Sequence, residues 1–198
     1  AMQEHQITIG ETSYQLERPF LVLATQNPIE QEGTYPLPEA QVDRFMFKLL
    51  VGYPEKSSER LVLRMNSNSE NSGEIKPLIS SDKIVESQNL INKIYVDEKV
   101  EDYALNLIFA TRSPSEYGLS DLENIIDFGA SPRATINLIR SAKARAFMDH
   151  RGFVTPEDIR YIGSDVLRHR IILTYEAEAE EITSDDIINR LFEVIEVP

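Results

Sequence analysis

The sequence predicts an α/β part over residues 1–52 and an all-α part over residues 53–198. Two apolar runs predict the first part. Residues 20–24 and residues 45–51 are each short and almost continuously apolar, which is typical of strands covered on both faces of a parallel sheet. A third observation predicts the second part: after the Gly-Tyr-Pro that ends the latter run, apolar residues recur at the spacing of amphipathic helices. We therefore expect an α/β fold class followed by a helical domain.

The α/β part opens with a predicted hairpin. Apolar and polar residues alternate over residues 7–16 on both sides of a turn near Gly10. The apolar run 20–24 comes next, and a short helix is expected after a Pro-Leu-Pro sequence. Pro38 suits the first helical position, and Glu39 suits the positive end of the helix dipole. That helix leads directly into the second apolar run.

The all-α part contains clear helix signals. Asp97 and Ser131 are suitable N-caps, and Pro132 and Pro156 suit first helical positions. In each case an apolar face at helical spacing follows. The predicted helices cover residues 82–93, 98–111, 132–148, 156–169 and 185–196. The polar stretch 66–73 is expected to be a loop, and the apolar stretch 113–128 has no clear pattern.

Composition excludes several kinds of chemistry. The chain has no cysteine, so a disulfide, a thiolate metal site and a cysteine nucleophile are all excluded. His5, His150 and His169 have no metal-ligand spacing and are expected to be solvated or to cap helices. A net charge of -13 disfavours nonspecific binding to nucleic acid or to an anionic membrane. No apolar run approaches the length of a membrane span.

Two side chains near the predicted sheet suit a nucleotide site shared between neighbouring subunits. Asn27 comes just past the carboxyl end of the run 20–24, where an amide can hold a water molecule and a phosphate oxygen together. Arg44 ends the short helix near the same sheet edge, where its guanidinium could meet phosphate charge on a neighbour. The alternative for Arg44 is a simple surface ion pair with Asp43.

Arg133 is a third candidate. It lies in the first turn of the predicted helix 132–148, where a positive charge opposes the helix dipole at a cost of about 0.3 to 1 kcal/mol. Helix N-termini attract anions, and an arginine added to one makes a phosphate clamp. The alternative is a side chain that extends its charge into solvent.

Three motifs resemble those of one known family. They are ATQNP around Asn27, EGTYPLPEAQVDRF around Arg44, and GASPRAT around Arg133. Together they resemble the MoxR branch of the AAA+ ATPases, and the resemblance extends over essentially the whole chain. It implies that Asn27 is sensor 1, Arg44 the arginine finger and Arg133 the sensor 2 residue. The implied fold is the C-terminal portion of an AAA+ P-loop core followed by an all-α lid.

Part of the ATPase machinery expected of that family is absent from the sequence. No G-x-x-x-x-G-K-[ST] loop is present. Residues 94–98 imitate a Walker B strand but follow sensor 1, so Asp97 is interpreted as a helix cap. The resemblance therefore implies a C-terminal fragment. We expect ATP and Mg²⁺ to be bound in the intact protein, with none bound to this chain.

The resemblance also implies a role and partners. MoxR-like ATPases are expected to form a hexameric ring, to be cytoplasmic, and to act as chaperones that mature or assemble protein complexes, often with von Willebrand factor A proteins. Two alternatives stay open. One is a non-catalytic interaction module that retains the fold. The other is a DNA-remodelling relative, which would want basic residues on the hairpin 7–16, where there are none.

Overall fold

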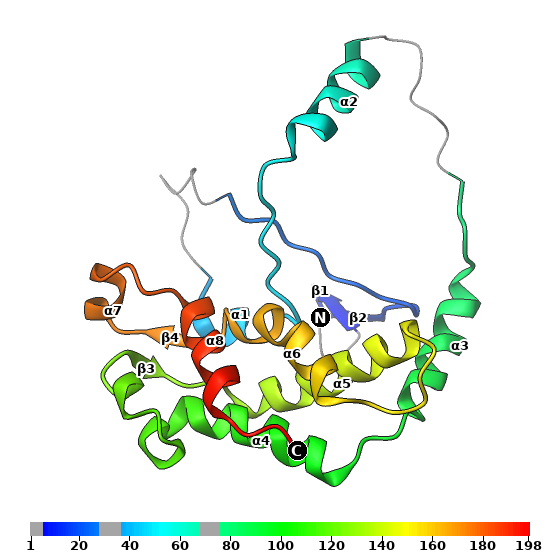
Figure 1. Ribbon diagram of the computed structural model, residues 1–198. Coiled ribbons are helices and arrows are strands. Elements are labelled where there is room, and N and C mark those ends of the chain that lie inside the picture. Colours follow the sequence, from blue (N-terminus) through cyan, green and yellow to red (C-terminus); the bar gives the residue numbers. More distant parts are fainter. Residues whose placement is uncertain (1–5, 28–36, 68–75) are drawn as a thin grey trace.

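The computed structural model describes residues 6–27, 37–67 and 76–198. Four helices form the body of the molecule (Figure 1), and we refer to them as the helical body. They are α4 (Glu98–Arg112), α5 (Pro132–Met148), α6 (Pro156–Leu167) and α8 (Ser184–Val194). Helix α5 packs against both α4 and α6, and α8 closes the core against α6 and α4.

The core of the helical body is aliphatic. Tyr103 is the one large aromatic side chain among its most completely buried described residues. Burial of this apolar surface is the main force that holds the helices together. The largest fully buried aliphatic side chains are Leu107, Ile108, Leu119, Leu138, Ile159, Val166, Leu167, Ile188 and Leu191.

The helices begin where the sequence places their caps. The Asp97 carboxylate accepts from the Lys99 amide at the start of α4, and the Ser131 hydroxyl accepts from the Arg133 amide at the start of α5. The interpretation of Asp97 as a helix cap is therefore confirmed. Thr155 and Thr183 begin α6 and α8, each in a reciprocal capping box with an aspartate three residues later.

The N-terminal hairpin is confirmed. Strands β1 (Gln6–Ile9) and β2 (Thr12–Gln15) pair antiparallel, with Gln6 opposite Gln15. Gly10 has φ 63° in the connecting turn, a conformation that glycine adopts without steric cost. The hairpin side chains are almost all exposed, so the hairpin contributes little to the core.

Neither apolar run of the α/β part forms a strand. Residues 20–24 and 45–51 are extended or bent, and no described strand pairs with either. Leu23 is 84% exposed and Val51 is 92% exposed. The apolar pattern is that of a covered strand, but a strand forms only where a neighbour pairs with its backbone.

The short helix α1 (Glu39–Val42) follows the expected Pro-Leu-Pro sequence, with Pro38 as its N-cap rather than its first helical residue. Helices α2 (Lys56–Ser67) and α3 (Ser81–Asn92) come next. No residue of α2 is buried, and Figure 1 shows it held away from the helical body by extended chain. The expected loop 66–73 begins within α2, and its remainder lies outside the described residues.

The second part is not purely helical. Strand β3 (Ile126–Phe128) pairs antiparallel with β4 (Ile172–Leu173), and a short helix α7 (Tyr175–Ala179) follows. The stretch 113–128 forms two 3-10 turns, Pro114–Tyr117 and Ser120–Leu122, before β3. Such short elements carry too few residues for a periodic signal. No helix of the described residues is both long and apolar enough to cross a membrane.

Candidate functional site

The Asp43 carboxylate is the centre of a cluster that joins two distant parts of the chain. It lies just after α1 and accepts hydrogen bonds from three side chains of the helical body. The Ser131 hydroxyl lies 2.9 Å from both carboxylate oxygens. Arg133 Nη1 lies 3.2 Å from Oδ2, and Arg170 Nε lies 3.0 Å from Oδ1. One carboxylate therefore fixes the end of α1 against the start of α5 and the end of α6.

Close packing behind α5 delivers Ser131 and Arg133 to this cluster. A Cβ atom on Gly129 would lie 2.4 Å from the Thr111 carbonyl oxygen, so only glycine fits there. The Thr111 hydroxyl accepts from the Ala130 amide at 2.9 Å, and Arg112 Nε donates to the Ala130 carbonyl at 2.7 Å. The end of α4 thus holds the GASPRAT motif in position. The GASPRAT motif therefore contributes close backbone packing through Gly129 and Ala130 as well as the charge of Arg133.

Arg170 is the most buried member of the cluster, with a side chain that is 0% exposed. Besides the Asp43 carboxylate, its Nη2 donates to the Asp43 carbonyl at 2.8 Å and to the Phe45 carbonyl. Its Nη1 donates to the Met46 carbonyl at 3.3 Å and to the Val166 carbonyl within α6. All three guanidinium nitrogens therefore donate hydrogen bonds, as a buried arginine requires.

The neighbours of Arg170 extend this contact along residues 43–48, which we call the docked segment. His169 Nε2 lies 3.1 Å from the Phe45 carbonyl oxygen, and Arg168 Nη1 donates to the Lys48 carbonyl at 2.6 Å. In return, the Lys48 amide donates to the Asp165 carbonyl at 2.9 Å. Four carbonyls and one amide of the docked segment are thus paired with residues 165–170.

The expected roles of the histidines need one correction. His150 is exposed, as expected, and His5 lies outside the described residues. His169 is instead buried, and burial together with the Arg170 charge lowers its pKa to about 4. Because a carbonyl only accepts, the neutral ring must carry its proton on Nε2 to reach Phe45. Its Nδ1 is buried and has no hydrogen-bond partner among the described residues.

The electrostatics of the cluster leave one positive charge in excess. Two guanidinium groups, Arg133 and Arg170, face the single Asp43 carboxylate. Burial would raise the pKa of Asp43, but the Ser131 hydrogen bond and the two arginines hold it below its usual range. Arg133 is 42% exposed, so the excess positive charge faces solvent on the Arg133 side. This is where an anion could bind.

The three predicted site residues are only partly brought together. Arg133 is in the cluster, and Arg44 follows Asp43 directly, with its amide bonded to the Gln41 carbonyl at 3.2 Å. The Arg44 side chain is exposed. Asn27 is also exposed, at the end of a described stretch of chain, and its role stays a prediction. An Asp43–Arg44 pair is not what organises the site, because Asp43 is bonded to Ser131, Arg133 and Arg170.

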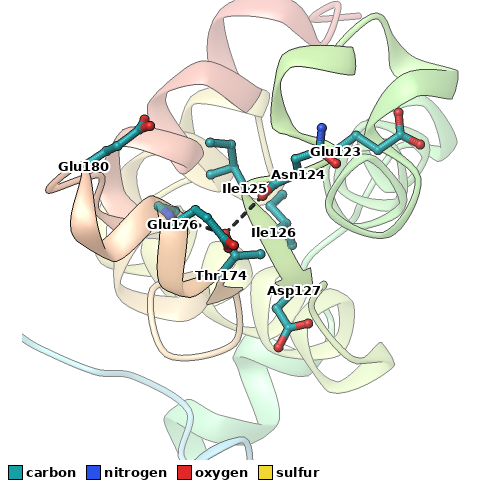
Figure 2. Close-up of a pocket in the computed structure, with 9 residues that line it drawn as sticks. Glu123, Asn124, Ile125, Ile126, Asp127, Thr174, Glu176 and Glu180 are labelled. Carbon is teal, nitrogen blue, oxygen red and sulfur yellow. Dashed lines mark hydrogen bonds between the residues drawn. The ribbon is translucent and has the colours of Figure 1, made fainter.

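A cavity elsewhere in the described structure does not suit a nucleotide. It has a volume of about 620 Å³ and lies between residues 123–127, which lead into and include part of β3, and α7 with its flanking residues Thr174 and Glu180. Its lining includes Glu123, Asp127, Glu176 and Glu180 and no basic residue, so phosphate would be repelled. Figure 2 shows the carboxylates of Glu123, Asp127 and Glu180 pointing apart, and no described group of acidic residues or histidines could hold a metal ion.

Comparisons with known proteins agree with this architecture. Residues 1–47 match the model of the "ATPase family associated with various cellular activities (AAA)", and residues 120–191 match the AAA lid domain. The first match contains Asn27 and Arg44. The second contains Arg133 and the α6 end that binds the docked segment.

Individual relatives match along most or all of the chain. The chaperone MoxR1 of Mycobacterium tuberculosis is 41% identical over 100% of this chain and 52% of its own length. The protein MoxR of Methylorubrum extorquens is 29% identical over 89% of this chain and 55% of its own length. A crystal structure of a Cytophaga hutchinsonii protein described as an ATPase has 52% identity and a TM-score of 0.94, over 100% of this chain and 60% of that one.

The chain therefore spans about half the length of the curated relatives that it matches. Both family models fit in the order that the sequence motifs predict. The lid model covers α5, which carries Arg133, and the turn after α6, which carries Arg170. The chain is homologous along its whole length to MoxR-family AAA+ ATPases and has the fold of the C-terminal portion of such an ATPase, with its lid domain.

Proposed function

We propose that this chain supplies one side of an ATP site formed between neighbouring subunits of a ring, most simply a hexamer. In the intact protein, a phosphate-binding loop and acidic residues outside this sequence would hold ATP and Mg²⁺. Arg44 would reach the nucleotide of the adjacent subunit as an arginine finger, a role worth about 10³ to 10⁵ in rate. Asn27 would orient the attacking water on the subunit's own site.

One observation carries this proposal and refines the role of Arg133. Asp43 binds Arg133 and is the residue immediately before Arg44, so both arginines belong to one edge of the molecule. Arg133 is partly exposed and carries the positive charge that Asp43 leaves unbalanced. This shared edge favours a single nucleotide for both arginines. We therefore assign both arginines to the same, neighbouring nucleotide, and Arg133 links that nucleotide to the lid.

Mixed rings of the intact ATPase test the assignment. Arg44→Ala should lower kcat by about 10³ while leaving ATP affinity of the isolated subunit nearly unchanged. Mixing Arg44→Ala with a phosphate-loop variant creates some interfaces with an intact finger facing an intact loop, so activity should partly return. Mixing Arg44→Ala with Asn27→Ala should also restore activity, because those residues serve different sites.

The decisive mixture is Arg44→Ala with Arg133→Ala. If both act on the neighbour, every interface lacks one of them and mixing restores nothing. If Arg133 instead acts on its own subunit's nucleotide, some interfaces become complete and activity returns. Formation of mixed rings, checked by mass spectrometry, makes either result conclusive. Restored activity would contradict the shared assignment of the two arginines.

The cellular role follows from relatives only. The name of the M. tuberculosis relative supports a chaperone-like role. We propose on family grounds that the intact protein uses ATP hydrolysis to mature or assemble protein complexes. A von Willebrand factor A protein is the partner that we propose on family grounds. The hairpin Gln6–Gln15 has no basic side chain and carries Glu11, which gives the DNA-remodelling alternative no support. Copurification of protein partners with the intact ATPase, set against binding to DNA, would test this choice.

A further inference from the structure

We propose that Arg170 is a positioning residue that makes the backbone around Arg44 part of the lid, so that the finger and the lid move as one body. The inference rests on the proposed function of Arg44 and goes beyond it, because it names what sets the position of the finger. Arg170 lies in the helical body, far from Arg44 in the sequence, and would touch no nucleotide.

The contacts of Arg170 flank Arg44 on both sides. Its guanidinium binds the Asp43 carboxylate at 3.0 Å and the Asp43 carbonyl at 2.8 Å before the finger. After the finger it binds the carbonyls of Phe45 and Met46. A residue whose neighbours are held on both sides can shift little along the chain direction. The planar, five-donor guanidinium is the only side chain that can make this set of bonds.

Helix α1 cannot provide this positioning by itself. It has four residues, none of them buried, and its N-cap Pro38 makes no side-chain hydrogen bond. A single isolated turn of helix has little stability in water. The segment that follows is paired by no described strand. The position of Arg44 is therefore set by the end of α6, which is anchored in the core through Val166 and Leu167.

The same group also connects the finger to Arg133. Arg170 and Arg133 bind opposite oxygens of the Asp43 carboxylate, Oδ1 and Oδ2. A rotation of the lid would displace α5 and α6 together, because they make the most extensive helix–helix contact of the body. Arg133 and Arg44 would then move in concert relative to a neighbour's nucleotide. A misplacement of about 1 Å at a catalytic group can lower the rate about 100-fold.

Arg170→Lys in the intact ATPase tests the proposal, with Arg151→Lys as a matched control. Arg151 also binds a buried carboxylate, Asp158, but only within the helical body. We expect Arg170→Lys to lower kcat by about 10-fold to 100-fold with a change in KM for ATP of less than about 3-fold. Arg151→Lys should leave kcat per folded molecule nearly unchanged.

Mixed rings separate positioning from general damage. Arg170→Lys mixed with a phosphate-loop variant should regain activity, whereas Arg170→Lys mixed with Arg44→Ala should not, because both defects lie on the finger side. Regain with Arg44→Ala would overturn the proposal. The mixture of Arg44→Ala with the phosphate-loop variant is a separate control, whose ATPase activity tests the finger assignment alone. If that mixture fails, the finger assignment itself is wrong, and the inference falls with it.

Two further measurements cover the case in which Arg170→Lys does not fold. His169→Ala removes the bond to the Phe45 carbonyl, and His169→Gln retains a donor in its place. We expect the first to lower kcat about 5-fold and the second to recover most of it. In the 198-residue chain, the Lys48 amide, which donates to Asp165, should lose hydrogen-exchange protection in His169→Ala but not in Arg151→Lys. Equal protection in both variants would refute the docking role.

Discussion

Acidification should weaken the fold through His169 in a way that a single substitution removes. Burial and the nearby Arg170 lower the pKa of this imidazole to about 4, from 6.5 in the unfolded chain. The unfolded state therefore binds the proton more tightly than the folded state. Stability is unaffected above about pH 6.5 and falls as the pH decreases toward 4, where the folded ring also becomes protonated.

The size of the effect follows from this difference in pKa. At pH 5 the unfolded imidazole is almost fully protonated and the folded one is not, which removes at most about 2 kcal/mol from the free energy of unfolding. The limit at lower pH is about 3 kcal/mol. The Phe45 carbonyl bond, which raises the pKa, already contributes to the value of about 4. Work at pH 5 and above avoids most titration of the carboxylates.

Urea denaturation of the 198-residue chain at pH 7.5 and pH 5 measures this effect directly. His169→Gln retains a donor for Phe45 but cannot titrate, so its loss of stability between the two pH values should be smaller by about 2 kcal/mol. His150→Asn removes an exposed histidine and should behave as the wild type. An identical pH dependence in the wild type and His169→Gln would refute a buried, neutral His169.

The remaining predictions concern packing, capping and nucleotide binding. Gly129→Ala should destabilise the chain by about 2 to 3 kcal/mol, because its Cβ would meet the Thr111 carbonyl at 2.4 Å, whereas Gly152→Ala meets nothing and should be nearly neutral in urea denaturation. Asp158→Asn should cost about 2 to 4 kcal/mol, since its buried carboxylate caps α6 and pairs with an arginine. Asp186→Asn, which weakens the exposed capping box of α8, should cost about 1 kcal/mol or less. If Asp158→Asn and Asp186→Asn lost equal stability, burial of Asp158 would add nothing. The 198-residue chain itself should neither bind nor hydrolyse ATP, because it lacks the phosphate-binding loop; micromolar binding by calorimetry would contradict the site proposed above.

Much of the fold could be predicted because it depends on local chemistry. Asp97 and Ser131 cap helices at the positions expected from the sequence, and α5 has the predicted bounds Pro132–Met148. The hairpin also forms as its alternating pattern predicts. In each case the interacting groups lie within a few residues of one another. Local hydrogen bonds of this kind can be inferred from sequence spacing alone.

The short elements of the second part could not be predicted in the same way. Strand β4 has two residues, Ile172 and Leu173, and pairs with β3 across the chain. The expected strand at residues 45–51 was wrong because a clear apolar pattern does not supply a pairing partner. Its apolar pattern suits a covered strand, but the pairing of its backbone is decided by whatever lies next to it, here the end of α6.

The residues of the candidate site also differ in whether local sequence could identify them. Arg133, Arg44 and Asn27 could be selected from the sequence because their chemistry is tied to local positions: a helix start, a helix end and the end of an apolar run. Arg170 was not among the selected residues, because Arg168-His169-Arg170 has the composition of a solvated, positively charged helix end. Only the run of two arginines around a histidine, just past a helix, could have suggested something more specific.

The sequence alone determined the helices that its caps begin, the hairpin, and the three residues that we assign to a nucleotide site. Tertiary structure alone decided that Asp43 joins Arg133 to Arg170 and that Arg170 is completely buried. Asp43 and Arg170 are 127 residues apart, so no local pattern relates them. A buried guanidinium is stable only where several acceptors meet it. Those acceptors exist only after the docked segment and the end of α6 have folded against each other.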